Sequence, residues 1–310
     1  MVKTREIDNI SYHLEGLTLT ALACGDENHQ PVLCLHGYLD NAASFLPLMQ
    51  TSNLLTGKRI IAVDWPGHGH SDHRSVGAHY HFIDYVGDLV ALFSLNNWQA
   101  IDIIAHSMGA MIASAFAAAF PEKVKSLTLI DSFGFICTPV EQTTHQLREG
   151  MLSRKRLIKP TSSVKPLRKF TENIAVKARM QVSDLTIEHA KLIVQRSLTS
   201  AQQRDDNKIM SNEDVTLYCW RSDPRLRSIS PYRLSLVQGQ QLFSDIKCPL
   251  LLIYGDKGMK MVATGLDNFA SVVNNLTTIK LMGGHHVHME QAKALSSLLN
   301  NFFNRIQTSV

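Results

Sequence analysis

The residue that carries the clearest chemical signal is Ser107, in the run Ala105-His106-Ser107-Met108-Gly109. This run follows the β-branched segment Ile101 to Ala105 and precedes an alanine-rich stretch, Ala110 to Phe120, of helical composition. A serine on such a strand-to-helix turn projects its hydroxyl clear of the sheet, and the start of the helix stabilises negative charge beside it. The turn requires small residues two positions before and two positions after the serine. These are Ala105, where glycine is more usual, and Gly109. The pattern predicts a nucleophilic serine.

A serine hydroxyl needs a base at neutral pH, and the elements around Ser107 must bring one to it. Short apolar runs without polar alternation predict buried parallel strands at Val32–Leu35, Ile60–Val63, Ile101–Ile104, Leu127–Ile130 and Leu250–Ile253, and a last strand at Thr278–Leu281. Helical segments follow most of these runs, which is typical of a doubly wound α/β sheet. Ligands bind at the carboxyl ends of such strands. The polar residues found there are His36 to Asp40, Asp64 to Gly69, Ser107, Asp131, Asp256 and the stretch Gly283 to Glu290.

The strand and helix alternation fails from Phe135 to Phe243, where Lys, Arg, Gln and Met are frequent. This interval is too long for a loop. We expect a helical lid at 135–243, inserted into a core of residues 1–134 and 244–310. Apolar side chains of the lid either line an acyl pocket or, as is usual for buried Met and Leu, pack a small helical core. They are Met151, Leu152, Phe170, Met180, Leu192, Ile193 and Met210.

Composition excludes several other classes of protein. The net charge is +4, and the segment from Glu141 to Arg227 holds 17 basic against 10 acidic residues, a local +7 with few aromatics and no nucleic-acid module. We interpret this charge as solvated helix surface, with no nucleic-acid partner. No apolar run is long enough for a membrane span, and the charged first 16 residues do not resemble a signal peptide, so a cytoplasmic location is expected. Five widely spaced cysteines predict reduced thiols. Fourteen histidines lack metal-ligand spacing, and no phosphate-binding loop is present, so neither a metal nor another cofactor is expected.

The order of serine, acid and histidine along the chain resembles the α/β-hydrolase superfamily from Val32 to about Phe303. Three segments are similar to its serine hydrolase-like protein subgroup, namely Gly37 to Phe45, Gly77 to Tyr85 and Asp223 to Leu226. The resemblance implies an α/β-hydrolase fold, a mostly parallel sheet with helices on both faces and the inserted lid.

Carried over residue by residue, the resemblance implies Ser107 as nucleophile and His285 as general base, with His286 and His288 as competing histidines. Asp256 is favoured as the acid that orients the histidine, and Asp131 is the alternative. The backbone N–H groups of Tyr38 and Met108 are the expected oxyanion donors. His36 is expected to hold its loop through hydrogen bonds.

A serine at this position forms an acyl-enzyme that water resolves. The sequence therefore predicts a serine hydrolase acting on a small-molecule carboxylic ester or thioester through a Ser-His-Asp triad. Aspartate-dependent dehalogenase and epoxide hydrolase chemistry is disfavoured, because those enzymes of the superfamily attack with aspartate. Two alternatives stay open. One is hydrolysis of a carbon–carbon bond on the same scaffold, and the other is a non-catalytic ligand-binding homologue.

Overall fold

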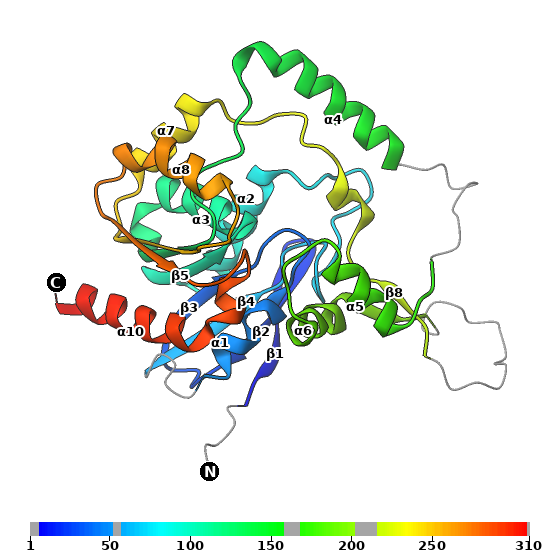
Figure 1. Ribbon diagram of the computed structural model, residues 1–310, viewed down its shortest axis with the longest axis horizontal. Helices are drawn as coiled ribbons and strands as arrows, with labels where there is room; N and C mark the ends of the chain where they lie inside the picture. Colours follow the sequence, from blue (N-terminus) through cyan, green and yellow to red (C-terminus); the bar gives the residue numbers. More distant parts are fainter. Residues whose placement is uncertain (1–5, 52–56, 158–167, 202–215, 309–310) are drawn as a thin grey trace.

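The computed structural model describes residues 6–51, 57–157, 168–201 and 216–308 (Figure 1). Its main element is an eight-stranded sheet in the order β1-β2-β4-β3-β5-β6-β9-β10. The strands, in that order, are β1 (Asp8–Leu14), β2 (Leu17–Cys24), β4 (Lys58–Val63), β3 (Gln30–Leu35), β5 (Ile101–His106), β6 (Val124–Ile130), β9 (Leu250–Gly255) and β10 (Leu276–Leu281). The six strands from β4 to β10 are parallel, which confirms the predicted strands and their α/β arrangement.

The first two strands form an antiparallel hairpin that the sequence analysis did not predict. β2 also pairs antiparallel with β4, so the hairpin extends one edge of the parallel sheet. Its outer strand, β1, alternates exposed and half-buried residues, as expected where only one face of a strand is covered.

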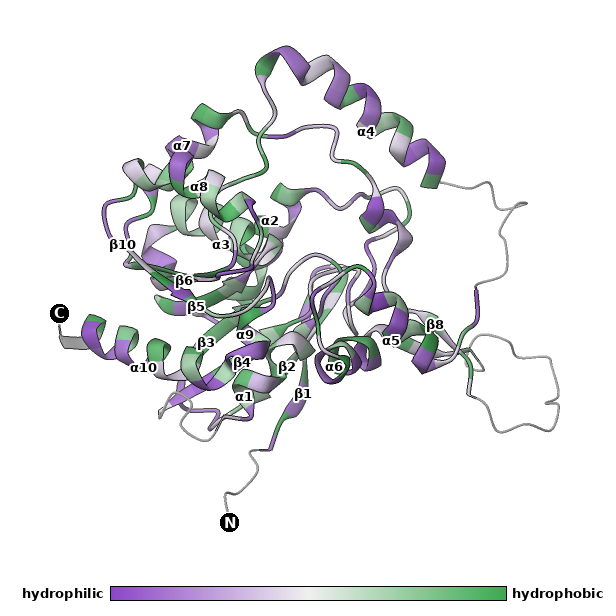
Figure 2. Cartoon of the chain, in the orientation of Figure 1, coloured by the Kyte–Doolittle hydropathy of each residue, from purple (hydrophilic) through white to green (hydrophobic). Residues whose placement is uncertain are grey.

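Helices cover both faces of the sheet (Figure 1). Alternate residues of β3 show why: Leu33 and Leu35 are buried in one apolar cluster, and Val32 and Cys34 in another on the opposite face. The first cluster includes residues of α2 (Phe82–Leu95), α3 (Met108–Ala119), α7 (Leu236–Asp245) and α8 (Met261–Phe269). The second includes residues of η1 (Ala42–Phe45), α1 (Leu46–Met49), α9 (Val287–Glu290) and α10 (Ala292–Thr308). The strands at the middle of the sheet are correspondingly hydrophobic in Figure 2.

The predicted insertion between β6 and β9 is largely helical, with a small ribbon that was not predicted. Its elements are α4 (Thr143–Leu157), α5 (Glu172–Met180), α6 (Ile187–Ser197), β7 (Leu198–Ser200), β8 (Tyr218–Trp220) and a short 3-10 turn, η6 (Pro224–Arg227). Both expected boundary residues, Phe135 and Phe243, are buried in the core cluster, and Phe243 belongs to α7. We therefore propose that the part standing apart from the core is shorter than 135–243 and ends before α7.

The apolar side chains of the insertion mostly pack on one another. Phe170 and Ile193 are buried in a third cluster, and Met180 and Leu192 pack against it. Met151 and Leu152, on α4, are exposed, and Met210 lies outside the described residues. The interpretation as a small helical core thus holds for four of these seven residues.

Helix α6 is attached to the core through polar contacts. The Arg196 guanidinium donates to the fully buried Asp64 carboxylate at the end of β4 (Nε–Oδ2 2.9 Å) and to Asn9 Oδ1 of β1 (2.8 Å). The side-chain amide of Asn41 donates to Ile193 O (2.8 Å) and Ser197 Oγ (2.9 Å). These bonds fix the carboxyl half of α6 over the end of the sheet.

All five cysteines are free. Among the described residues, no helix combines the length and the apolar composition that crossing a bilayer requires.

Candidate active site

Ser107 occupies the turn between β5 and α3, at the carboxyl edge of the sheet. Its backbone has φ +53° and ψ −117°, an unusual conformation for a residue with a side chain, of the kind that the sharp strand-to-helix turn imposes. The turn brings α3 close to the end of β3. A Cβ at Gly109 would lie 2.5 Å from Leu35 O, and one at Gly37 would lie 3.0 Å from Ser107 Cβ. Glycine at these two positions therefore allows the close approach, as the sequence indicated for Gly109.

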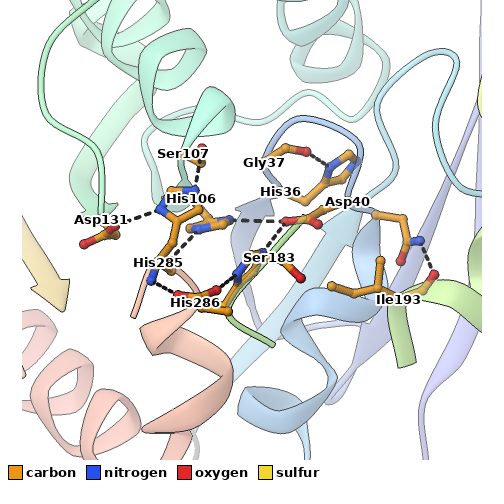
Figure 3. A network of polar contacts seen from close by, with 12 residues as sticks. His36, Gly37, Asp40, His106, Ser107, Asp131, Ser183, Ile193, His285 and His286 are labelled. Carbon is orange, nitrogen blue, oxygen red and sulfur yellow. Dashed lines mark hydrogen bonds and ion pairs between the residues drawn. The ribbon is translucent and has the colours of Figure 1, made fainter. Parts of the chain in front are cut away.

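His285 lies between Ser107 and Asp131 (Figure 3). Its Nδ1 is 2.7 Å from Asp131 Oδ2, and its Nε2 is 3.0 Å from Ser107 Oγ. A carboxylate only accepts, so Nδ1 carries the proton and Nε2 of the neutral ring is free to accept the hydroxyl proton. Serine, histidine and acid thus stand in the order that general-base activation of a serine requires.

Asp131, the alternative acid, takes the position for which the sequence favoured Asp256. Asp131 follows β6 with φ +44°, is fully buried, and also accepts from Gly255 N (3.0 Å) and Met259 N (2.9 Å). Asp256 is exposed, and its carboxylate accepts from Gly283 N (2.8 Å). Within the described chain no hydrogen bond or ion pair joins Asp256 to His285, so the geometry favours Asp131 over Asp256 as the acid. Both aspartates follow strand ends, but the Asp256 carboxylate binds Gly283 N, whereas the Asp131 carboxylate binds the imidazole.

The two expected oxyanion donors flank the serine. Met108 is the first residue of α3, and Tyr38 follows Gly37, which packs against Ser107. Within the part of the chain that the structure describes, no loop or turn hydrogen bond uses the backbone N–H of either residue. These two N–H groups stay the predicted oxyanion donors. His36 holds this loop as expected, with Nδ1 2.8 Å from Gly37 O and Nε2 accepting from Trp65 N (3.0 Å).

The competing histidines do not reach the serine. His286 points away from Ser107 toward Asp40 (Figure 3), with Nε2 3.3 Å from Asp40 Oδ2 and Nδ1 2.7 Å from Asp184 Oδ1. Both ring nitrogens face carboxylates, so both carry protons and the ring is charged. Burial opposes this charge, but Asp40 and Asp184 raise the pKa of His286 to about 9. His288 is buried against Phe45, and burial holds its pKa well below the usual value.

A buried polar network next to the triad was missed in the sequence. Arg179 of α5 donates to Asp40, and His106 Nδ1 lies 3.6 Å from the same carboxylate. Burial favours the neutral form of Asp40, but His286 and Arg179 keep its pKa well below the usual value. Asp40 carried a signal, because it follows a strand end. Arg179 and Asp184 carried none, because they lie in the insertion, about a hundred residues from the histidines they meet.

The ligand atoms of Asp40, His106 and His286 all lie within 4.8 Å of one another, a spacing that invites comparison with a metal site. The surrounding charges do not fit one. The Arg179 guanidinium already contacts Asp40 and lies 3.4 Å from His286 Nε2, where it would repel a second cation. The charged His286 ring has no lone pair to offer. The cluster therefore has the character of an ion-pair network.

Comparisons with known proteins agree with this fold. Residues 30–292 match the sequence pattern of the alpha/beta hydrolase fold family. The chain is 29% identical over 286 residues to a serine hydrolase-like protein of Danio rerio, covering 90% of this chain and 82% of the relative. A crystal structure of a hypothetical protein from Pseudomonas aeruginosa PAO1 superposes with a TM-score of 0.81 at 30% identity, covering 96% of this chain and 99% of that one. A thioesterase domain from the curacin biosynthetic pathway shares the fold, with a TM-score of 0.76 at 23% identity over 96% of this chain and 99% of that one.

Proposed function

Because this chain belongs to the alpha/beta hydrolase fold family, we propose that it is a serine hydrolase that cleaves small-molecule carboxylic esters or thioesters through an acyl-enzyme on Ser107. The observation that carries the proposal is the continuous contact from Ser107 Oγ to His285 Nε2 (3.0 Å) and from His285 Nδ1 to Asp131 Oδ2 (2.7 Å). Asp131, rather than Asp256, is the proposed acid.

In the first half of the reaction, His285 Nε2 accepts the hydroxyl proton while Ser107 Oγ attacks the substrate carbonyl carbon. Asp131 holds the ring in the required tautomer and stabilises the imidazolium that forms. The carbonyl oxygen becomes an oxyanion, and the N–H groups of Tyr38 and Met108 donate to it. Each such donor contributes roughly 3 kcal/mol. The imidazolium then protonates the leaving alcohol or thiol as the carbon–oxygen or carbon–sulfur bond breaks.

In the second half, His285 takes a proton from water, which attacks the acyl carbonyl, and returns that proton to Ser107 Oγ as the bond from the acyl carbon to Oγ breaks and the acid is released. Oxygen esters and thioesters give the same acyl-enzyme, so the triad alone does not choose between them. Family membership supports the hydrolase class, and the name of the zebrafish relative supports a serine nucleophile.

The test is covalent labelling with a fluorophosphonate, followed by turnover of ester and thioester series of increasing acyl length. We expect wild type to be labelled and Ser107→Ala to be unlabelled, with turnover lowered on the order of a millionfold. The matched control is Ser114→Ala on α3, the helix that follows Ser107. The Ser114 hydroxyl donates to Ala110 O at 2.8 Å, and this variant should retain labelling.

Two other outcomes identify the alternatives. Labelling without turnover of any ester or thioester would favour the carbon–carbon bond hydrolase. Folded wild-type protein that is neither labelled nor active would favour the binding homologue and refute the proposal.

A further inference from the structure

We propose that Asp184, a residue of the insertion, is a positioning residue for the general base His285, so that the insertion completes the geometry of the active site. This inference rests on the proposed function of Ser107 and His285. The observation behind it is that one carboxylate binds two consecutive residues of the histidine loop.

Asp184 lies in the connection between α5 and α6. Its Oδ2 accepts a hydrogen bond from the backbone N–H of His285, and its Oδ1 accepts from His286 Nδ1 at 2.7 Å. Although partial burial opposes it, these two bonds lower the pKa of Asp184, so the carboxylate stays charged. The residues before His285 are Gly283, with φ +147°, and Gly284. The N–H groups of Gly283 and Gly284 donate to Asp256 (2.8 Å) and Glu290 (3.2 Å), and Asp184 supplies the acceptor for the next N–H, that of His285. Because glycine leaves the backbone intrinsically mobile, this third acceptor helps to fix the loop at His285.

The backbone carbonyl of His285 is held as well. His106 Nε2 lies 3.0 Å from His285 O. A carbonyl only accepts, so Nε2 of His106 carries the proton, and burial agrees by lowering the pKa of His106 to about 4 and keeping the ring neutral. The N–H, the carbonyl and the Nδ1 of His285 are thus bound by Asp184, His106 and Asp131, respectively. These contacts leave Nε2 directed at Ser107.

The same network reaches the loop that carries the proposed oxyanion donor. The Asp40 carboxylate binds the charged His286 and Arg179. The backbone N–H of Asp40 donates to the carbonyl oxygen of Gly37 (3.2 Å), the residue that precedes Tyr38. Two positive and two negative groups alternate in the order Arg179, Asp40, His286 and Asp184. The α5–α6 part of the insertion therefore contacts both the base and the oxyanion loop. A purely steric cover would not need such contacts.

The experiment compares Asp184→Ala, Asp184→Asn and Asp184→Glu with Glu172→Gln in the full-length protein. Glu172 is an acidic residue of the same insertion whose carboxylate accepts from Gln195 Nε2 (3.0 Å), away from the triad. Turnover is measured per fluorophosphonate-titrated Ser107, so that unfolded molecules do not count. We expect Asp184→Ala to lower kcat by about tenfold to a hundredfold, the effect of a misplaced catalytic group, with little change in KM. Asp184→Asn keeps one acceptor and should lose less, Asp184→Glu should restore part of the rate, and Glu172→Gln should match wild type.

Two further readouts separate positioning from general stability. The Asp184 side chain is 35% exposed, so formate can enter the space left by alanine and should partly restore kcat of Asp184→Ala without affecting wild type. The amide proton of His285, assigned by comparison with His285→Gln, should exchange with solvent faster in Asp184→Ala than in wild type.

An active wild type with unchanged kcat, no rescue by formate and unchanged His285 exchange in Asp184→Ala would refute the positioning role alone. A drop confined to KM would also refute it. A wild type that neither labels nor turns over any substrate would refute the proposed function and the positioning role with it.

Discussion

Replacing Asp131 by asparagine tests which acid orients His285. The Asp131 carboxylate accepts three hydrogen bonds, from His285 Nδ1, Gly255 N and Met259 N. Asparagine offers one oxygen and one NH2 group in the same space. If its oxygen keeps the bond to Gly255, the NH2 group faces His285 and Met259, which are both donors. His285 can then pair with it only by moving its proton to Nε2, where the ring can no longer accept from Ser107.

We therefore expect Asp131→Asn to lower kcat by about 10⁴, the usual effect of an acid-to-amide change that leaves the wrong tautomer. This corresponds to about 5 kcal/mol of transition-state stabilisation. The matched control is Asp256→Asn. Its side-chain oxygen still accepts from Gly283 N, so kcat should stay close to that of wild type.

The assay is steady-state hydrolysis of the best ester found in the labelling study, with urea unfolding of each variant to confirm that it is folded. Near-wild-type turnover of folded Asp131→Asn would refute the assignment. Loss of turnover in Asp256→Asn, with retention in Asp131→Asn, would restore the acid that the sequence favoured.

Two further predictions concern packing and pH. Gly109→Ala places a methyl group 2.5 Å from Leu35 O, so we expect the free energy of unfolding to fall by about 1–3 kcal/mol and labelling of the serine to slow; unchanged urea unfolding would contradict the close approach. The pKa of His286 is raised to about 9 in the folded protein by Asp40 and Asp184, so its stabilising effect is complete below about pH 6.5 and is lost as pH rises through about 9. Between those two pH values, the free energy of unfolding of wild type, measured with urea, should fall by on the order of 3 kcal/mol more than that of His286→Gln. Parallel losses in the two proteins would show that His286 is not the responsible group.

The parts of the fold that follow local patterns could be predicted from the sequence. Continuous apolar runs such as Val32–Leu35 and Leu250–Ile253 are strands buried on both faces, and the turn at Ser107 is encoded by its immediate neighbours. The hairpin of β1 and β2 was missed although Ile10, Tyr12 and Leu14 alternate with polar residues. That alternation is typical of an antiparallel edge strand and differs from the continuous apolar runs of the buried parallel strands.

The sequence indicated site residues only where they follow the predicted end of a strand. Ser107 was predicted from the strand-to-helix turn and His285 from the resemblance to the α/β-hydrolase superfamily, and the structure brings them together. The choice between Asp131 and Asp256 depends on which way each chain turns after its strand, which side-chain types do not reveal. The role proposed for Asp184 depends on a contact across 101 residues, and no short-range pattern marks it.

The anchoring of α6 has a consequence for how substrate travels to and from Ser107. Asp64 is fully buried and Arg196 is its guanidinium partner, so lifting α6 would leave a carboxylate without its counter-ion, at a cost of about 3–5 kcal/mol. Helix α4 is not held by such an ion pair. Arg154 of α4 contacts the ring of His81 in the core (Nη2–Nε2 2.6 Å), and within the described residues no ion pair joins α4 to the core. We expect the insertion to open on the α4 side and to stay fixed on the α6 side, so that product leaves without disturbing the contacts that orient His285.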